Sequence, residues 1–130
     1  GRPVIAADTS TWVAYLEGAG GEDTDLLDQA LADRQVVMPP AVLTELLSNP
    51  RLSRPATESL IELPLIEMNE DYWERAGLWR AKVIGKRMKA RLGDALIAQS
   101  CIDAGVALIT RDRDFLAFAR AAGLNLAAGR

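Results

Sequence analysis

Residues 93–115 read GDALIAQSCIDAGVALITRDRDF, and this stretch decides the fold that we expect. Apolar residues recur at helical spacing after Asp94, and Gly105 is a typical helix stop. The next run, 106–109, is continuously apolar, as in a strand covered on both faces. A helix that packs on the strand following it runs antiparallel to that strand. We therefore expect Asp94, at the helix start, and residues 110–114, after the strand, at the same edge of a sheet.

Short apolar runs alternate with helical patterns along the rest of the chain. The expected strands are 4–7, 36–38, 65–68, 106–109 and 124–126, and the expected helices are 9–17, 25–33, 39–48, 54–63, 71–88, 94–104 and 115–122. This alternation predicts an α/β fold with a short parallel sheet of four to five strands and helices on both faces. The 130 residues suit one domain over 1–130. The start Gly1-Arg2-Pro3 lacks Met, so we expect these residues to be a remnant in front of the domain.

Composition excludes several classes of chemistry. The chain contains no histidine, which excludes Ser-His-Asp and Cys-His mechanisms and every metal site that uses histidine. Cys101 is the single cysteine and lies among apolar residues, so it predicts a buried thiol and no disulfide. A metal site would consist of oxygen ligands, which suit Mg²⁺, Mn²⁺ or Ca²⁺. No apolar run is long enough to span a membrane and no signal peptide is visible, so we expect a cytoplasmic protein without membrane contact.

Five acidic residues from four segments are expected at the carboxyl edge of the sheet, where ligands bind in such folds. They are Asp8, Glu45, Asp94, Asp112 and Asp114. Asp8 follows the first strand, and Glu45 lies in the second turn of a helix after the second strand. Helical side chains lean towards the helix N-terminus, which directs Glu45 towards the same edge.

Each acid also has a structural interpretation when it is considered alone. Asp8 is a suitable N-cap, and Asp94 complements a helix dipole. Glu45 suits a solvated helix edge, while Asp112 and Asp114 suit loop acids that cap the last helix, with Arg111 and Arg113 as counter-charges. The convergence argues against a purely structural role for all five, since crowded carboxylates raise one another's pKa values unless a cation compensates. A divalent cation there would activate water and stabilise charge on a phosphate, which indicates phosphodiester chemistry without a side-chain nucleophile.

Four short motifs, in order over essentially the whole chain, resemble the PIN domain, specifically the VapC-type toxin ribonucleases. The motifs are Asp8-Thr9-Ser10, Pro39-Ala41-Val42-Glu45, Gly93-Asp94-Ala95-Ile97-Ala98, and Thr110-Arg111-Asp112-Arg113-Asp114-Phe115. The resemblance implies an Mg²⁺- or Mn²⁺-dependent endoribonuclease that cuts cellular RNA, is restrained by a cognate antitoxin protein and forms a homodimer. It also implies that Asp8, Glu45, Asp94 and Asp112 form the acidic quartet, that Asp114 is a frequent fifth acid, and that the Thr110 hydroxyl orients the site.

Residues 75–93 contain seven basic residues and no acid, although the net charge of the chain is −3. The structural interpretation is a solvated helix face and loop. The functional hypothesis is that Lys86, Arg87, Lys89 and Arg91 contact RNA phosphates and steer RNA to the metals. The spacing of the three tryptophans favours packing in a core or dimer over base stacking. An exposed apolar face on the early helices is where a dimer partner or antitoxin helix would bind.

Two other classes of function remain open. One is a non-catalytic PIN-like module that binds RNA or protein, against which the complete acidic set argues. The other is a metal-dependent phosphatase with an aspartyl nucleophile, but such an enzyme needs a second Asp two residues after Asp8, where this chain has Ser10. Neither glycine pattern of the phosphate-loop or dinucleotide-binding proteins is present.

Overall fold

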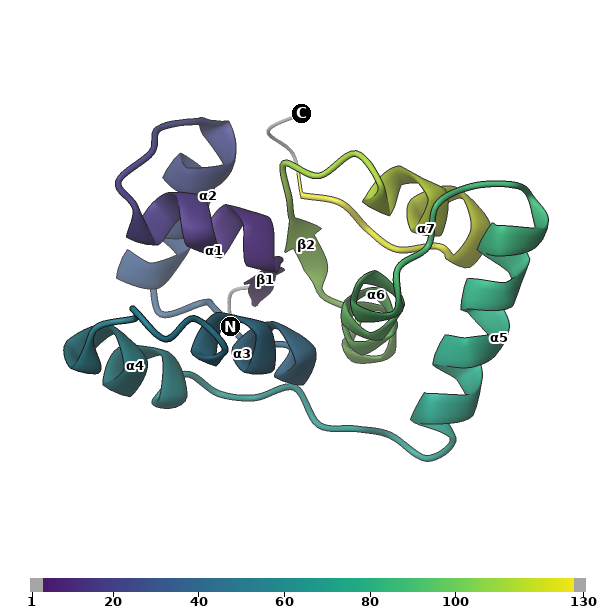
Figure 1. Ribbon diagram of the computed structural model, residues 1–130, viewed down its shortest axis with the longest axis horizontal. Helices are drawn as coiled ribbons and strands as arrows, with labels where there is room; N and C mark the ends of the chain where they lie inside the picture. The colour runs from purple at the N-terminus through teal and green to yellow at the C-terminus, as the bar shows by residue number, and fades with distance from the viewer. Residues whose placement is uncertain (1–3, 128–130) are drawn as a thin grey trace.

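Strands β1 (Ile5–Ala7) and β2 (Ala107–Ile109) lie side by side and parallel in the computed structural model, which describes residues 4–127 (Figure 1). Ile5 pairs with Ala107 and Ala7 with Ile109. The backbone N–H of Asp8 donates to the carbonyl oxygen of Ile109 at 3.0 Å, so the pairing of the two strands continues as far as Asp8, the first of the expected acids. The expectation for residues 1–3 lies outside the described residues.

Three further segments extend this pair through single parallel bridges. Val36 bridges to Ile5, Met38 to Leu65, and Leu126 to Leu108. The expected five-segment parallel arrangement is therefore present, but only β1 and β2 are regular strands within residues 4–127. Proline explains part of the difference at one edge. Pro39 directly follows Met38, and because it has no N–H it cannot continue the ladder.

Seven helices surround the strands in the described part of the chain, and helices α2 and α6 both pack against β2. The expected α/β architecture is confirmed. The helices are α1 (Thr9–Leu16), α2 (Glu22–Ala32), α3 (Pro40–Leu47), α4 (Arg54–Ile61), α5 (Tyr72–Gly85), α6 (Leu92–Ala104) and α7 (Phe115–Ala122).

Several helix boundaries differ from the sequence-based expectation, and three of them lie next to the residues of interest. Helix α2 begins at Glu22 rather than Asp25, and its three first-turn acids complement the helix dipole. Helix α6 begins at Leu92, which puts Asp94 inside the first turn. Helix α5 ends at Gly85 rather than Met88, because Arg87 adopts the left-handed conformation (φ 61°). The Met88 N–H then donates to the carbonyl oxygen of Val83, which closes the helix in the manner usual for a left-handed cap.

The core lies between the strands and the helices that pack on them. Cys101 is fully buried there, as expected, and burial raises the pKa of its thiol to about 12. Trp12 is buried, whereas Trp73 is 61% exposed and so does not belong to the core of this chain. Within residues 4–127 no helix has the length and apolar character needed to cross a membrane.

Candidate metal centre

Asp8 stands directly after β1 and is 2% exposed. Its Oδ1 accepts a hydrogen bond from the Thr11 N–H at 2.9 Å, so Asp8 caps α1 as its N-cap position suggested. The Thr110 hydroxyl donates to Oδ2 at 2.6 Å, and the Ser10 hydroxyl lies 2.9 Å from both carboxylate oxygens. Burial raises the pKa of Asp8, and these hydrogen bonds oppose that rise.

Thr110 joins the first acid to the loop between β2 and α7. While its hydroxyl donates to Asp8, the same oxygen accepts the Asp112 N–H at 2.9 Å. Asp112 Oδ1 in turn accepts the Asp114 N–H at 2.9 Å. The loop is thus shaped by its own polar groups, with Asp8 fixed at one end.

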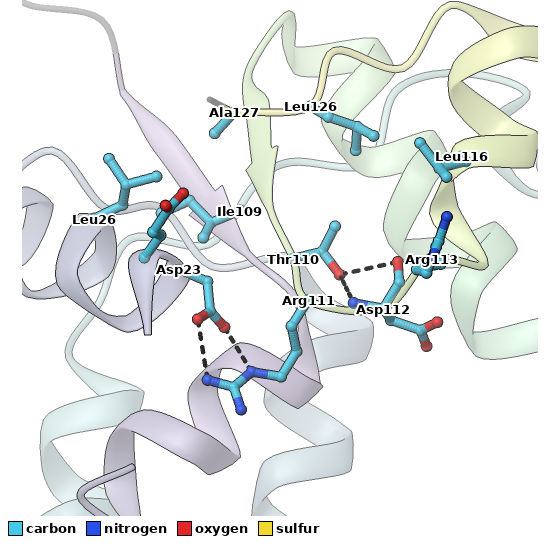
Figure 2. Close-up of a pocket in the computed structure, with 11 residues that line it drawn as sticks. Asp23, Leu26, Ile109, Thr110, Arg111, Asp112, Arg113, Leu116, Leu126 and Ala127 are labelled. Carbon is cyan, nitrogen blue, oxygen red and sulfur yellow. Dashed lines mark hydrogen bonds and ion pairs between the residues drawn. The ribbon is translucent and has the colours of Figure 1, made fainter. Parts of the chain in front are cut away.

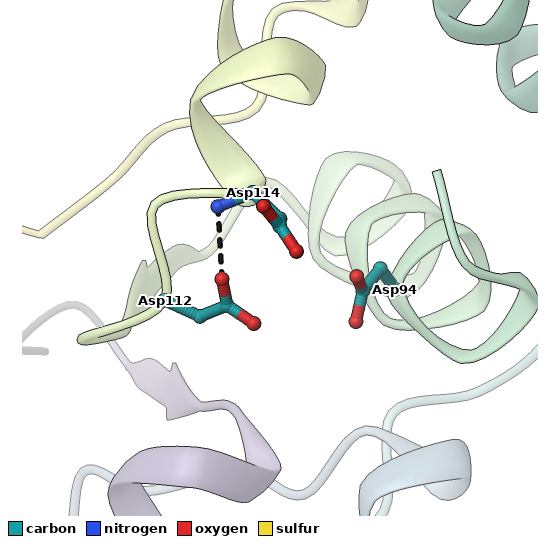
Figure 3. Close-up of side chains that lie close together, drawn as sticks. All are labelled: Asp94, Asp112 and Asp114. Atoms are coloured by element: carbon teal, nitrogen blue, oxygen red, sulfur yellow. Dashed lines mark hydrogen bonds between the residues drawn. The ribbon is translucent and has the colours of Figure 1, made fainter. Parts of the chain in front are cut away.

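Asp94, Asp112 and Asp114 face one another across the gap between α6 and this loop (Figure 3). Each offers a carboxylate oxygen, and the three oxygens lie within 4.8 Å of one another. All three side chains are partly buried. Asp8 and Glu45 are outside this close set, so the structure gathers three of the five predicted acids and leaves two at its border.

Glu45 approaches the start of α6 from helix α3. A Cβ atom on Gly93 would lie 2.9 Å from Glu45 Oε2, which shows how closely the carboxylate approaches the backbone next to Asp94. The Thr9 hydroxyl donates a short hydrogen bond to Glu45 Oε1. Glu45 is therefore held near the acids, although its side chain is exposed.

The crowding has an electrostatic consequence at Asp94. Burial is the main cause that raises the pKa of Asp94 to about 6, and the charges of Asp112, Asp114 and Glu45 add to it, while Arg91 opposes them. Asp94 Oδ2 is also buried without a hydrogen-bond partner among the described residues. A buried carboxylate oxygen without a partner is costly, and a hard divalent cation is a group that would satisfy it.

The counter-charges differ from the expected arginines. Arg111 does not neutralise Asp112 or Asp114, because its guanidinium pairs with Asp23 of α2, with Nε 2.7 Å from Oδ2. Lys89 Nζ and Arg91 Nη2 instead approach Asp114 Oδ2, at 3.6 and 3.4 Å. Both basic side chains are more than half exposed.

Sequence reasoning missed the Asp23–Arg111 pair. The Thr11 hydroxyl also donates to Asp23 Oδ2 at 2.9 Å, so α1, α2 and the loop after β2 meet at one carboxylate. Asp23 was expected outside any helix, and Arg111 was assigned to the wrong acids. Nothing in the local sequence joins residues that are 88 positions apart.

The fold and the site define a single-domain α/β protein with a carboxylate cluster at the carboxyl edge of a parallel sheet. The chain belongs to the PIN domain family, which matches residues 5–123. The relatives include VapC ribonuclease Mb1587 from Mycobacterium bovis and ribonuclease VapC11 from Mycobacterium tuberculosis. Each is 30% identical over 136 aligned positions, which cover 98% of this chain and 100% of the relative.

A solved structure gives the same fold. It is VapBC2 from Rickettsia felis bound to a DNA fragment from their promoter. The TM-score is 0.69 at 20% identity, with 95% of this chain and 97% of the other covered. The resemblance that the four motifs suggested is thereby confirmed at the level of family and fold.

Proposed function

We propose that this protein is a divalent-metal-dependent endoribonuclease of the toxin type, which hydrolyses RNA phosphodiester bonds. The observation that carries the proposal is the close set of Asp94, Asp112 and Asp114, in which Asp94 has a buried carboxylate oxygen without a partner among the described residues. Membership of the PIN domain family and similarity to proteins named VapC ribonucleases support the ribonuclease activity.

The donor set fits Mg²⁺ or Mn²⁺. Every polar side chain in the close set is a carboxylate, the ligand type that these hard cations prefer. Asp94, Asp112 and Asp114 would hold the metal, and Asp8 and Glu45 would complete the acidic site at its border. When bound, the metal lowers the pKa of a coordinated water and stabilises negative charge on the phosphate.

The other parts of the chain hold these acids in place. The Thr110 hydroxyl orients Asp8 and the backbone of Asp112 together, and the Thr9 hydroxyl orients Glu45. Because Asp94 has a pKa of about 6, it is largely ionised at neutral pH and able to bind a cation.

The segment 86–91 is proposed to bind RNA next to the acids. Lys89 and Arg91 are exposed and already lie within 4 Å of Asp114, so a phosphate contact there would bring the RNA backbone to the carboxylates. Lys86 and Arg87 lie in the turn that follows α5, and both are exposed. Contacts of this kind give affinity that falls with salt and does not depend on base sequence.

A cognate antitoxin, a homodimer and a cytoplasmic location complete the proposal. The similarity to proteins named VapC, together with the fold shared with the VapBC2 structure from Rickettsia felis, supports an antitoxin partner. Exposed apolar side chains are available for such contacts: Val13 and Leu16 on α1 are about 40% exposed, and Trp73 and Leu78 on α5 are 61% and 67% exposed.

The test is cleavage of a mixed cellular RNA pool by the purified protein with Mg²⁺ or Mn²⁺. An EDTA control and an Asp94→Asn variant are run in parallel, with Asp25→Asn as a matched variant of an exposed acid outside the site. We expect cleavage by the wild type and by Asp25→Asn, and loss of cleavage with EDTA and in Asp94→Asn.

Intact RNA with folded, antitoxin-free protein would favour the non-catalytic binding module. A measurement of the melting temperature with and without Mn²⁺ then tests whether the protein binds the metal. A rise that is lost in Asp94→Asn supports the metal site, whereas no rise in the wild type would contradict it.

A further inference from the structure

A pocket of about 750 Å³ opens beside the candidate metal centre and has no part in the proposal above (Figure 2). Helix α2 lines one side, and the start of α7 lines the other. Thr110 and Asp112 belong both to this pocket and to the acidic site. A chain that places one of its phosphates at the acids would therefore bring a neighbouring unit into the pocket.

Arg111 gives the pocket a rigid, flat surface. Its guanidinium is held by Asp23 through two hydrogen bonds, from Nε at 2.7 Å and from Nη2 at 3.0 Å. The side chain remains 40% exposed and lines the pocket. These bonds lie in the guanidinium plane and leave its face available for stacking, and arginine stacks on nucleic-acid bases in this way.

Apolar side chains complete the walls. Figure 2 shows Leu126 and Ala127 on the opposite side of the pocket from the Arg111–Asp23 pair, with Leu26 and Leu116 on the flanks. Such walls suit a planar, partly apolar group. The pocket volume exceeds what a single base needs and leaves space for its ribose.

Two charged side chains of the lining have no ion pair or hydrogen bond within residues 4–127. Arg113 follows Asp112 directly and is exposed, so it is available for a phosphate. Glu22 is also exposed, whereas both oxygens of its neighbour Asp23 are occupied by Arg111 and Thr11. A carboxylate is a pure acceptor, and guanine is the base that presents two adjacent N–H donors, at N1 and N2, to one carboxylate.

We infer that this pocket binds the nucleoside next to the scissile phosphate of an RNA strand. Arg111 stacks on the base, Arg113 contacts the adjoining phosphate, and Glu22 accepts from the base edge and favours guanine. This inference rests on the proposed ribonuclease function, because it names a subsite of the same substrate.

The test measures binding apart from cleavage. Fluorescein-labelled RNA heptamers, U₇ and U₃GU₃, are titrated in EDTA into Asp94→Asn protein, in which no cleavage is expected, and anisotropy is recorded. Three further substitutions are added to this background: Arg113→Gln, Leu116→Trp to fill the pocket, and Glu22→Gln. The controls are Arg120→Gln, which removes an exposed charge from α7 away from the lining, and Ile61→Trp, which adds an indole on the exposed face of α4.

We expect Arg113→Gln and Leu116→Trp to weaken binding of both heptamers by about tenfold, since the first removes a charge-assisted phosphate contact and the second fills the space that the nucleoside would occupy. Glu22→Gln is expected to remove the preference for U₃GU₃ over U₇. The two controls are expected to bind as the parent does.

The outcomes separate the two proposals. Unchanged binding in all three pocket variants, or no binding of either heptamer, would overturn the pocket even if the wild type cuts RNA. If the pocket variants weaken binding while the wild type cuts no RNA, the nucleoside subsite stands and the nuclease proposal fails. Equal affinity for U₇ and U₃GU₃ in the parent would overturn the role of Glu22.

Discussion

Asp94 combines a stability cost with its proposed function. Its carboxylate is partly buried beside three other acids, and one of its oxygens lacks a partner among the described residues. A raised pKa means that the folded state binds the proton more tightly than the unfolded chain does. The ionised form of Asp94 therefore destabilises the metal-free fold at neutral pH, and that cost disappears as the pH falls through about 6 towards the ordinary aspartate range.

Asp94→Asn is accordingly expected to stabilise the metal-free protein at pH 7. The gain is on the order of 1 kcal/mol, which is less than the full pKa shift implies because the group is partly solvated. Urea denaturation in EDTA at pH 7 and pH 4 measures it. At pH 4 the gain should vanish, and Asp25→Asn should differ from the wild type by less than about 0.5 kcal/mol at either pH. A variant less stable than the wild type at pH 7 would contradict the crowding argument.

A substitution at Gly93 is expected to affect metal binding without lowering the stability of the fold. Its added Cβ would meet Glu45 Oε2, the end of a flexible side chain, so Glu45 can swing away at low cost. Alanine is also a better helix former than glycine, by roughly 0.5–1 kcal/mol. We expect Gly93→Ala to leave the melting temperature unchanged or higher in EDTA, and to reduce the rise that Mn²⁺ produces. An undiminished rise would show that the approach of Glu45 has no part in metal binding.

At the scale of elements, polar contacts from Arg75 and Tyr72 hold α5 against α6. Arg75 pairs with Asp103, with Nη2 2.8 Å from Oδ2, and the Asp103 side chain is only 7% exposed. The Tyr72 hydroxyl donates to the carbonyl oxygen of Leu96. These contacts hold the helix that leads into the basic segment against the helix that carries Asp94.

Arg75→Met should destabilise the protein by about 1–3 kcal/mol at pH 7, because it leaves a largely buried carboxylate without its cation. Arg75 lowers the pKa of Asp103, so the pair stabilises the fold above the ordinary aspartate range and loses this effect as the pH falls through the lowered value. Denaturation at pH 7 and pH 3 tests both statements. Arg54→Met is the control, because its pair with Glu58 is exposed and is expected to contribute less than about 0.5 kcal/mol.

The sequence predicted the elements better than their ends. Apolar runs that are followed by polar residues revealed the strand ends before Asp8 and Thr110, since the pattern itself reports burial. The end of α5 at Gly85 was missed because the left-handed residue that closes the helix is Arg87 rather than a glycine. The segments at Val36 and Leu126 were expected to be strands but form single bridges. The length of a ladder depends on how many consecutive residues lie opposite the neighbouring strand, and local composition does not encode this number.

The same distinction applies to the site. The close set of Asp94, Asp112 and Asp114 follows from topology and was foreseen as part of a larger cluster. The ion pairs of the basic residues were not predicted. Arg111 pairs with Asp23, and Lys89 and Arg91 lie close to Asp114, because packing sets the distances between these side chains. The catalytic and metal-binding roles of the acids stay predictions.

At the scale of the whole molecule, removal of metal should change the response to pH. Mn²⁺ is expected to raise the melting temperature at pH 7.5, and EDTA should reverse the rise. The rise should shrink as the pH is lowered from 7.5 to 5, because protons compete with the metal at Asp94, whose pKa is about 6. Differential scanning fluorimetry over this range checks the expectation, and a rise independent of pH would place the metal elsewhere.

The pairing of β1 with β2 also determines when the site can assemble on the ribosome. The hydrogen bond from Thr110 to Asp8 joins residues 102 positions apart, and the pairing of Ile5 with Ala107 spans the same sequence separation. Early helices can form while the chain is still being made, but Asp8 has neither neighbouring strand β2 nor Thr110 until nearly the whole domain has been synthesised. A nascent chain therefore carries an incomplete acidic site until β2 and the loop with Thr110, Asp112 and Asp114 have been synthesised.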